Sequence, residues 1–186
     1  MEKRKDSRGR NLRPGENQET NGCYRYRWQD KSGKRCTVRA WRLVQTDKTP
    51  AGKREGPCLR ELEKAIADDL RDGVDGQRAN KCSVNDIFAL YMSGKKDLAQ
   101  STKQNYSYMY AHYVADDFGL KKISAVKYSD VKAFYNFLIH ERGFKPNSME
   151  VINTILHPVF SLAVRDGLIR SNPVSGAMNE IKKSRD

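Results

Sequence analysis

Long apolar runs are missing from this sequence, and cysteine is scarce. No apolar run approaches the roughly 18 residues that a bilayer span requires, and the N-terminal stretch MEKRKDSRGR lacks the apolar core of a signal peptide. We therefore expect a cytoplasmic protein without a membrane partner. The three histidines are distant from the cysteines and no CxxC pair occurs, so no metal site is predicted. The four cysteines are Cys23, Cys36, Cys58 and Cys82.

Signatures of catalysis are missing as well. The sequence contains no HxxR, HExxH or GxSxG stretch and no glycine-rich phosphate loop. Paired carboxylates with the surroundings of a pocket are also not evident. The sequence therefore predicts no catalytic residues, no cofactor and no enzyme activity for the chain as it stands.

Basic residues are in excess, and they are concentrated near the N-terminus. The 186 residues carry a formal net charge of +12. Residues 1–54 contain 16 Lys and Arg against 6 Asp and Glu, whereas residues 55–82 are slightly acidic and residues 83–186 are moderately basic. A positive field of this kind attracts the phosphate backbone of nucleic acids. A polyanion is therefore the first candidate partner.

Turn signals and hydrophobic spacing divide the chain into two predicted domains of an α+β protein. Residues 1–13 are charged and almost without apolar side chains, so we expect a disordered basic tail there. Residues 14–74 are predicted to form a three-stranded antiparallel sheet packed on one helix. A polar linker at residues 75–82 would lead to an all-α bundle of four to five helices at residues 83–178.

The first domain is predicted from a hairpin signal and a helical repeat. Asn21-Gly22 is typical of a type I′ turn, in which both central residues have positive φ. Apolar residues recur at helical spacing in LRELEKAIADDLRDG, residues 59–73, which predicts a helix that ends at Gly73. The extended segments are expected at residues 16–20, 23–29 and 34–44. The predicted core consists of Tyr24, Tyr26, Trp28, Val38, Leu62, Ile66 and Leu70.

The sheet is predicted to have one aromatic and one basic face. In CYRYRWQD, residues 23–30, rings alternate with arginines at the period of a strand, and CTVRAWRL, residues 36–43, repeats the alternation. Arginines opposite each other across strands repel unless an anion is present, and a ribbon of this width fits the major groove of DNA. We therefore predict duplex DNA binding, with a merely solvated face as the alternative. The basic face would contain Cys23, Arg25, Arg27, Thr37, Arg39 and Trp41.

The helical domain gives a weaker signal. Helix starts are predicted at Ser83, Ser101, Ser129 and Asn147, and Pro158 is expected to kink the last helix or shift its boundary. Polar helix starts next to lysines can hold phosphate, although ordinary caps explain Ser101 and Asn147 equally well. The candidate contacts are Lys95, Lys96, Ser101, Thr102, Lys103, Asn105, Lys145, Asn147, Ser148 and Asn153.

Three stretches resemble a known family. RGRNLRPGENQETNGCYRYRW, residues 8–28, and WRLVQTDKTPAGKRE, residues 41–55, resemble the arm-type DNA-binding domain of conjugative-transposon integrases. These enzymes are tyrosine site-specific recombinases. AVRDGLIRSNPV, residues 163–174, resembles the close of their core-binding domain. The resemblance implies a bacterial cytoplasmic protein that acts in DNA integration and recombination.

The resemblance also implies partners and contact residues. Double-stranded DNA would be bound at arm-type and core-type attachment sites, together with possible self-association and an excisionase-type accessory protein. Glu19, Thr20 and Cys23 depart from the family's usual basic residues, and Glu19 would favour the amino group of cytosine. The implied sheet contacts are Asn17, Glu19, Thr20, Cys23, Arg27, Arg39, Trp41, Lys53 and Arg54.

The family's catalytic domain has no counterpart in this sequence. Its Arg, Lys, His-x-x-Arg set and nucleophilic Tyr would follow a linker that is expected to begin at residues 179–186, so we expect a fragment or a DNA-binding remnant. None of the nine tyrosines is predicted to be a nucleophile. Three alternatives stay open: a stand-alone regulator or inhibitor at attachment or promoter sites, a recombinase whose catalytic part was removed, and an RNA-binding protein.

Overall fold

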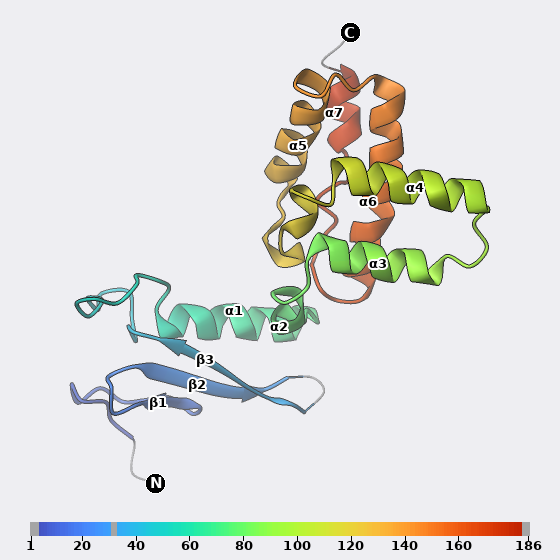
Figure 1. Ribbon diagram of the computed structural model, residues 1–186. Coiled ribbons are helices and arrows are strands. Elements are labelled where there is room, and N and C mark those ends of the chain that lie inside the picture. The colour runs from blue at the N-terminus through green and yellow to red at the C-terminus, as the bar shows by residue number, and fades with distance from the viewer. Residues whose placement is uncertain (1–3, 31–32, 184–186) are drawn as a thin grey trace. The chain divides into compact units, whose positions relative to one another are not determined.

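The computed structural model describes residues 4–30 and 33–183, and Figure 1 shows its strands and helices. The chain divides into two compact units, residues 1–73 and residues 74–186. A three-stranded sheet comes first and helices follow, so the predicted α+β fold class is confirmed. Among the helices of the described residues, none is long and apolar enough to cross a membrane.

The first unit contains strands β1, Glu16–Gln18, β2, Tyr24–Gln29, and β3, Arg35–Ala40, and the helix α1, Leu59–Asp72. The strands form an antiparallel sheet in the order β1-β2-β3, as predicted. The third strand is shorter than expected because the chain after Ala40 turns to α1. There, the backbone N–H of Leu59 donates to the carbonyl oxygen of Arg42 over 2.8 Å.

The turn between β1 and β2 differs from the predicted type I′ turn. Gly22 has a φ of +84°, and no described residue other than glycine has a positive φ, so Asn21 does not meet the type I′ requirement. The N–H of Gly22 donates to the carbonyl oxygen of Glu19, and the N–H of Glu19 donates to that of Cys23. This pattern belongs to a three-residue hairpin loop with a left-handed glycine, in which one positive φ is sufficient.

The core of the first unit lies between the sheet and α1, as predicted. Tyr24 is buried, whereas Tyr26, Val38 and Leu62 are half-buried around it. Trp28 stacks on Tyr26 with ring centroids 5.7 Å apart. Ile66 and Leu70 are only half-buried, so the core is smaller along α1 than expected. The predicted core lacked three buried residues of the apolar cluster around Tyr24, which are Ala40, Leu43 and Leu59.

The N-terminal segment is ordered by ion pairs, so the predicted disorder is wrong for residues 4–13, while residues 1–3 lie outside the described residues. The carboxylate of Asp6 is buried and accepts hydrogen bonds from the backbone N–H and the side chain of Arg10. Arg10 also pairs with Asp47 over 2.8 Å. Charged side chains thus fix this segment without a large apolar contact.

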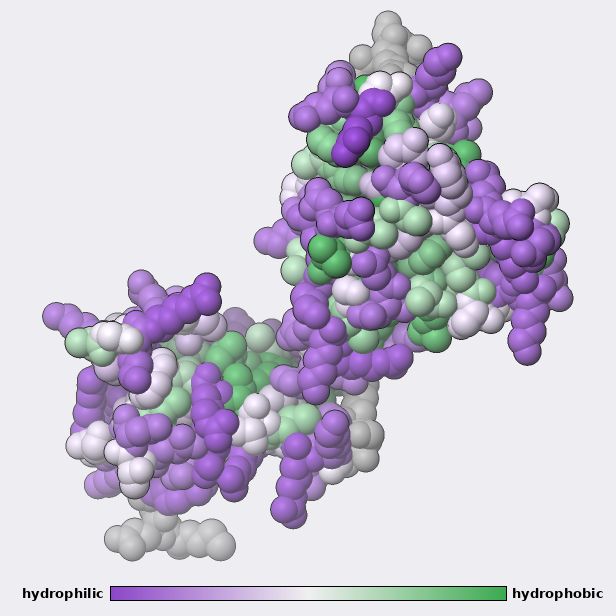
Figure 2. All heavy atoms as spheres, in the orientation of Figure 1, coloured by the Kyte–Doolittle hydropathy of each residue, from purple (hydrophilic) through white to green (hydrophobic). Residues whose placement is uncertain are grey.

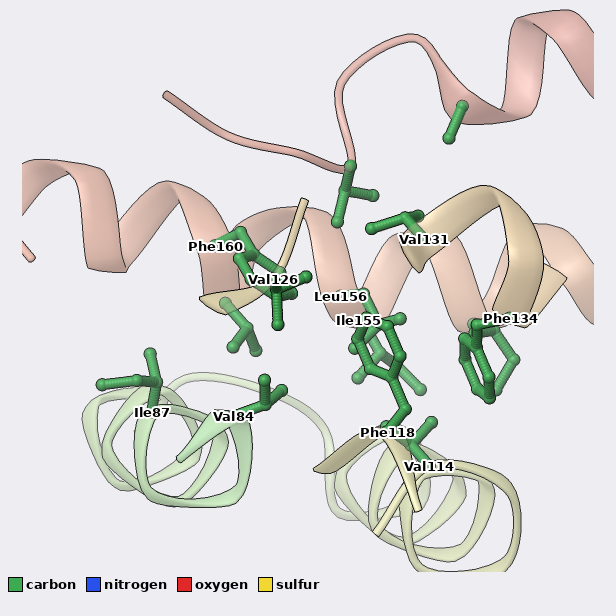
Figure 3. Close-up of a cluster of buried hydrophobic side chains, with 14 of the residues drawn as sticks. Val84, Ile87, Val114, Phe118, Val126, Val131, Phe134, Ile155, Leu156 and Phe160 are labelled. Carbon is green, nitrogen blue, oxygen red and sulfur yellow. The ribbon is translucent and has the colours of Figure 1, made fainter. Parts of the chain in front are cut away.

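The second unit consists of helices around one apolar core. Figure 3 shows part of this core, in which Phe118, Phe134 and Phe160 come from separate elements. Phe118 stacks on Phe134 with ring centroids 4.6 Å apart. The helices are α2, Gly76–Ala79, α3, Val84–Gly94, α4, Gln100–Tyr113, α5, Tyr128–His140, α6, Pro146–Arg165, and α7, Ala177–Lys183, with 3-10 turns η1, Phe118–Leu120, and η2, Ile123–Ala125.

The predicted linker at residues 75–82 contains helix α2 and contributes to the second unit. Ala79 is fully buried in the core of that unit. The backbone N–H of Asp75 donates to the carbonyl oxygen of Gly167 over 2.8 Å. Helix α7 likewise begins before residue 179, where the start of a linker was expected. Residues 184–186 lie outside the described residues.

One of the four predicted helix caps is confirmed. The Ser83 hydroxyl accepts from the N–H of Asp86, whose carboxylate accepts from the N–H of Ser83. Helices α4, α5 and α6 instead begin after Ala99, Lys127 and Lys145, so the caps predicted at Ser101, Ser129 and Asn147 are wrong. Proline occupies the first position of α6, where its missing N–H costs nothing. Pro158 lies inside α6 and does not shift its boundary.

Candidate nucleic-acid interface

Strand register brings the predicted basic side chains onto one face of the sheet. Arg25 lies opposite Arg39, and Arg27 lies opposite Thr37. Residues directly opposite each other in an antiparallel pair point to the same side. Tyr24 and Ala40, which are also opposite each other, belong to the core side. The predicted division into an aromatic and a basic face is therefore confirmed.

The same register adds two residues that sequence reasoning missed. Gln29 lies opposite Arg35, and both have the parity of Arg27. Both side chains are exposed, as is that of Arg27. A consistent count of alternate residues along both strands would have found them. We use the name "basic face" for Asn17, Glu19, Arg25, Arg27, Gln29, Arg35, Thr37 and Arg39.

Hydrophilic side chains cover much of the surface over the strands in the view of Figure 2. On the basic face, 59% of the Arg39 side chain is exposed, against 19% for Arg25. The face therefore presents guanidinium groups of unequal accessibility. A ribbon with exposed arginines can place them against phosphates or the edges of bases in a major groove.

Glu19 supplies the anion between the paired arginines. Its Oε1 accepts from Nη1 of Arg25 over 3.3 Å and from Nε of Arg39 over 3.1 Å. The predicted repulsion between Arg25 and Arg39 is thus compensated inside the protein, since one carboxylate oxygen neutralises part of both charges. The Nε of Arg25 is buried without a hydrogen-bond partner in the described part of the chain.

Cys23 is buried, although the sequence placed it among the exposed contacts. Only 5% of the residue is exposed, and its Sγ lies 3.5 Å from the carbonyl oxygen of Ala40. Burial raises the pKa of the Cys23 thiol, and the nearby carboxylate of Glu19 raises it further. Its side chain is therefore covered and cannot form part of the candidate interface.

Trp41 follows β3 and lies beside the segment that leads to α1. The Nζ of Lys53 is 4.6 Å from the centre of its ring, a cation–π distance. The ring is half-buried and lines a hollow together with Arg39 and Arg54. Lys53 and Arg54 are exposed, and Thr20 is exposed in the β1–β2 turn. The structure thus brings Trp41, Lys53 and Arg54 together beyond the end of β3.

In the second unit, one group of predicted contacts gathers between α3 and α4. The Nζ of Lys103 donates to the carbonyl oxygen of Lys96, and the Nζ of Lys95 lies over the ring of Tyr91. Lys95 and Lys96 are exposed. The remaining predicted residues of this group are Ser101 and Asn105, which are exposed, and Thr102, which is half-buried.

The other group lies at the start of α6, and one member has a structural role. Tyr135 is buried and donates its hydroxyl hydrogen to Oδ1 of Asn153 over 3.0 Å. Lys145 and Asn147 are exposed and Ser148 is half-buried. The Asn153 amide oxygen is therefore engaged inside the unit, and Lys145 and Asn147 are the accessible members of this group.

The described residues show no group of three or more His, Cys, Asp or Glu that could hold a metal ion. The four cysteines are free thiols. The chemistry of the candidate interface thus comes from guanidinium, ammonium and amide groups. Such groups bind and orient polyanions through charge and hydrogen bonds.

Two family models match separate parts of the chain. Residues 1–70 match the DNA binding domain of Tn916 integrase. Residues 83–139 match the phage integrase N-terminal SAM-like domain. The two matches correspond to the sheet unit and to the first part of the helical unit. They agree with the two resemblances seen in the sequence.

Two curated relatives match almost the whole chain. The transposase from transposon Tn916 of Enterococcus faecalis is 32% identical over 174 residues, which are 92% of this chain and 42% of the relative. The transposase from transposon Tn1545 of Streptococcus pneumoniae is 31% identical with the same coverage. The chain thus spans less than half the length of these relatives. Among solved structures, the solution structure of the Tn916 integrase N-terminal domain/DNA complex has 45% sequence identity to this chain and a TM-score of 0.35. The match covers 37% of this chain and 100% of the solved chain.

Proposed function

Since this chain is homologous to the N-terminal region of the Tn916 and Tn1545 transposases, we propose that it binds double-stranded DNA sequence-specifically and acts in DNA integration and site-specific recombination. The sheet unit is the arm-type DNA reader in this proposal. The helical unit makes a second contact, with the core-type site. Both units would act in the cytoplasm of a bacterium.

The observation that carries the proposal is the basic face of the sheet. Register places Arg25 and Arg27 on the same face as Arg39, away from the core side that α1 covers. A three-stranded ribbon fits the major groove, where an arginine distinguishes guanine through two hydrogen bonds to O6 and N7. Exposed Arg35 can in turn bind a phosphate and fix the register of the ribbon on the duplex.

A contact by the helical unit is supported by fewer observations. Residues 83–139 match a phage integrase domain, and the hydrogen bond from Lys103 to Lys96 brings two lysines together at the start of α4. Clustered lysines contribute affinity that falls with salt and does not depend on sequence. We therefore assign base recognition to the sheet and a phosphate grip to the helices.

Selection from random duplexes followed by footprinting tests this proposal. The chain should enrich two unrelated sequence motifs, one of which loses its footprint when Arg27 and Arg39 are replaced by alanine. The alternative function, a stand-alone regulator or inhibitor at attachment or promoter sites, predicts one enriched motif that the sheet alone protects. Enrichment of no duplex, or stronger binding to structured RNA in a competition assay, would contradict duplex recognition.

We further propose that these 186 residues bind DNA without cutting it, because the residues assigned here hold phosphates and bases and do not attack them. Incubation with nicked duplexes that carry the selected sites should give no covalent protein–DNA product on a denaturing gel. A labelled band that survives denaturation would contradict this. Self-association and an excisionase-type partner stay predictions. Sedimentation of the chain on selected DNA can check self-association.

A further inference from the structure

Glu19 holds a defined position between two arginines, and this position has a consequence for base recognition. The β1–β2 turn fixes its backbone, because the Glu19 N–H donates to the carbonyl oxygen of Cys23 over 2.8 Å. The Gly22 N–H donates back to the carbonyl oxygen of Glu19 over 2.9 Å. Only 22% of the Glu19 side chain is exposed, so its carboxylate is held close to the surface of the strands.

The two arginines that it binds differ in what they leave accessible. The Arg25 side chain is 19% exposed and donates to Glu19 from a terminal nitrogen. The Arg39 side chain is 59% exposed and donates to Glu19 from its Nε. Within the described residues, Nε is the nitrogen of Arg39 that forms a hydrogen bond. A guanidinium group carries five N–H donors in one plane. The four N–H groups on the two terminal nitrogens of Arg39 are thus left for a ligand.

We propose that Glu19 is a positioning residue that orients Arg39 for an end-on, bidentate contact with a guanine base. The inference rests on the proposed DNA-binding function and deepens it. A carboxylate on Nε fixes the plane of the guanidinium group before DNA arrives, so less side-chain entropy is lost when the two terminal nitrogens bind O6 and N7. This role differs from a direct contact with the amino group of cytosine, which the carboxylate of Glu19 would favour if it touched a base.

The rival role of Glu19 is that of a counter-ion which DNA displaces. A counter-ion lowers the charge of the basic face and weakens binding to every duplex alike, because phosphates are common to all sequences. A positioning residue acts at one base pair and requires a hydrogen-bond acceptor more than a charge. Glutamine in place of Glu19 keeps an acceptor and removes the charge, so it separates the two roles.

The experiment uses the full chain and the duplex obtained by selection. Dissociation constants are measured for that duplex and for versions in which each guanine is replaced by adenine. Arg39→Ala should abolish the preference at one guanine, on the order of tenfold. Glu19→Ala should reduce the preference at that same guanine several-fold, Glu19→Gln should retain most of it, and Glu19→Ala should have no further effect there when Arg39 is already alanine.

Asp72→Ala is the matched control, since it removes one exposed negative charge from α1 in the same unit. It should change affinity for all duplexes by the same factor and leave base preference unchanged. The inference is overturned if both Glu19 variants behave like this control, if Glu19→Ala retains the guanine preference, or if no guanine depends on Arg39. Failure of the wild-type chain to select any duplex would instead overturn the proposed function itself. Thermal unfolding of each variant identifies any loss of affinity that comes from unfolding.

Discussion

Glu63 is an ionisable group of the sheet unit whose replacement should raise the stability of that unit. It lies on α1 with only 10% of its side chain exposed, and its Oε1 is buried without a hydrogen-bond partner in the described residues. Its neighbour Glu16 is fully buried and is held by Nε of Arg60 over 3.0 Å. Burial, together with the hydrogen bond and the charge of Glu16, raises the pKa of Glu63 to about 7.

The sign and the size of the effect follow from this pKa. Folding favours the protonated form of Glu63, so its contribution to stability is fully present below its ordinary pKa of 4.5 and is lost as the pH rises to about 7. At about 1.36 kcal/mol per pKa unit the loss is at most about 3 kcal/mol. The charges of Arg13 and Arg60 are already included in this pKa, and screening by solvent reduces the effect to about 1–2 kcal/mol.

Glu63→Gln should therefore raise the free energy of unfolding by about 1–2 kcal/mol at pH 8, because an amide donates to Glu16 without having to hold a proton. At pH 4 the variant and the wild type should be equally stable. Urea unfolding between pH 4 and pH 8 measures both, and Glu55→Gln serves as an exposed control. Equal stability at pH 8, or an advantage of Glu63→Gln that persists unchanged at pH 4, would show that the charge of Glu63 does not destabilise the unit.

Three further predictions concern DNA binding and stability. Arg27→Ala and Arg39→Ala should each weaken binding to the sheet's selected site by ~1–3 kcal/mol, whereas Arg71→Ala on α1 should not; equal weakening on all DNA in a binding titration would make the first two phosphate contacts. Asp47→Asn should cost about 2–3 kcal/mol of stability at pH 7, measured by chemical unfolding. Hydrogen bonds from Arg10 and from backbone N–H groups outweigh burial and lower the Asp47 pKa, so the stability that the Asp47 carboxylate contributes should disappear as the pH falls below 3.8. Asn172→Ala should lower the melting temperature of the helical unit, because its amide donates to His157 and Ser161; an unchanged melting curve would contradict that.

The two faces of the sheet could be predicted because side chains alternate strictly along a strand. Tyr24 and Arg25 were assigned to opposite faces from spacing alone, and the register confirms both. The burial of Leu43 could not be predicted in this way, because it lies beyond β3 and depends on how the chain turns to α1. The spacing of apolar residues predicts burial within a strand or helix and gives little information about residues beyond the end of that element.

Specific charge pairs were the main source of error. The composition of residues 4–13 predicts disorder, because a composition count treats charges as solvated and cannot see that Asp6 and Asp47 enclose Arg10. The place of Glu19 between Arg25 and Arg39 depends on the geometry of one turn, which the predicted turn type did not give. The caps of α4, α5 and α6 were each predicted two residues too late, since serine and asparagine are common inside the first turn as well as before it.

We place duplex DNA on the face of the sheet opposite α1. Amide chemical shifts of the isotopically labelled full chain, recorded while the selected duplex is added, test it most directly. We expect the largest changes in β2 and β3, at the residues of the basic face, and small changes in α1. Large changes confined to the helical unit, or to the core side of the sheet around Tyr24 and Val38, would contradict it.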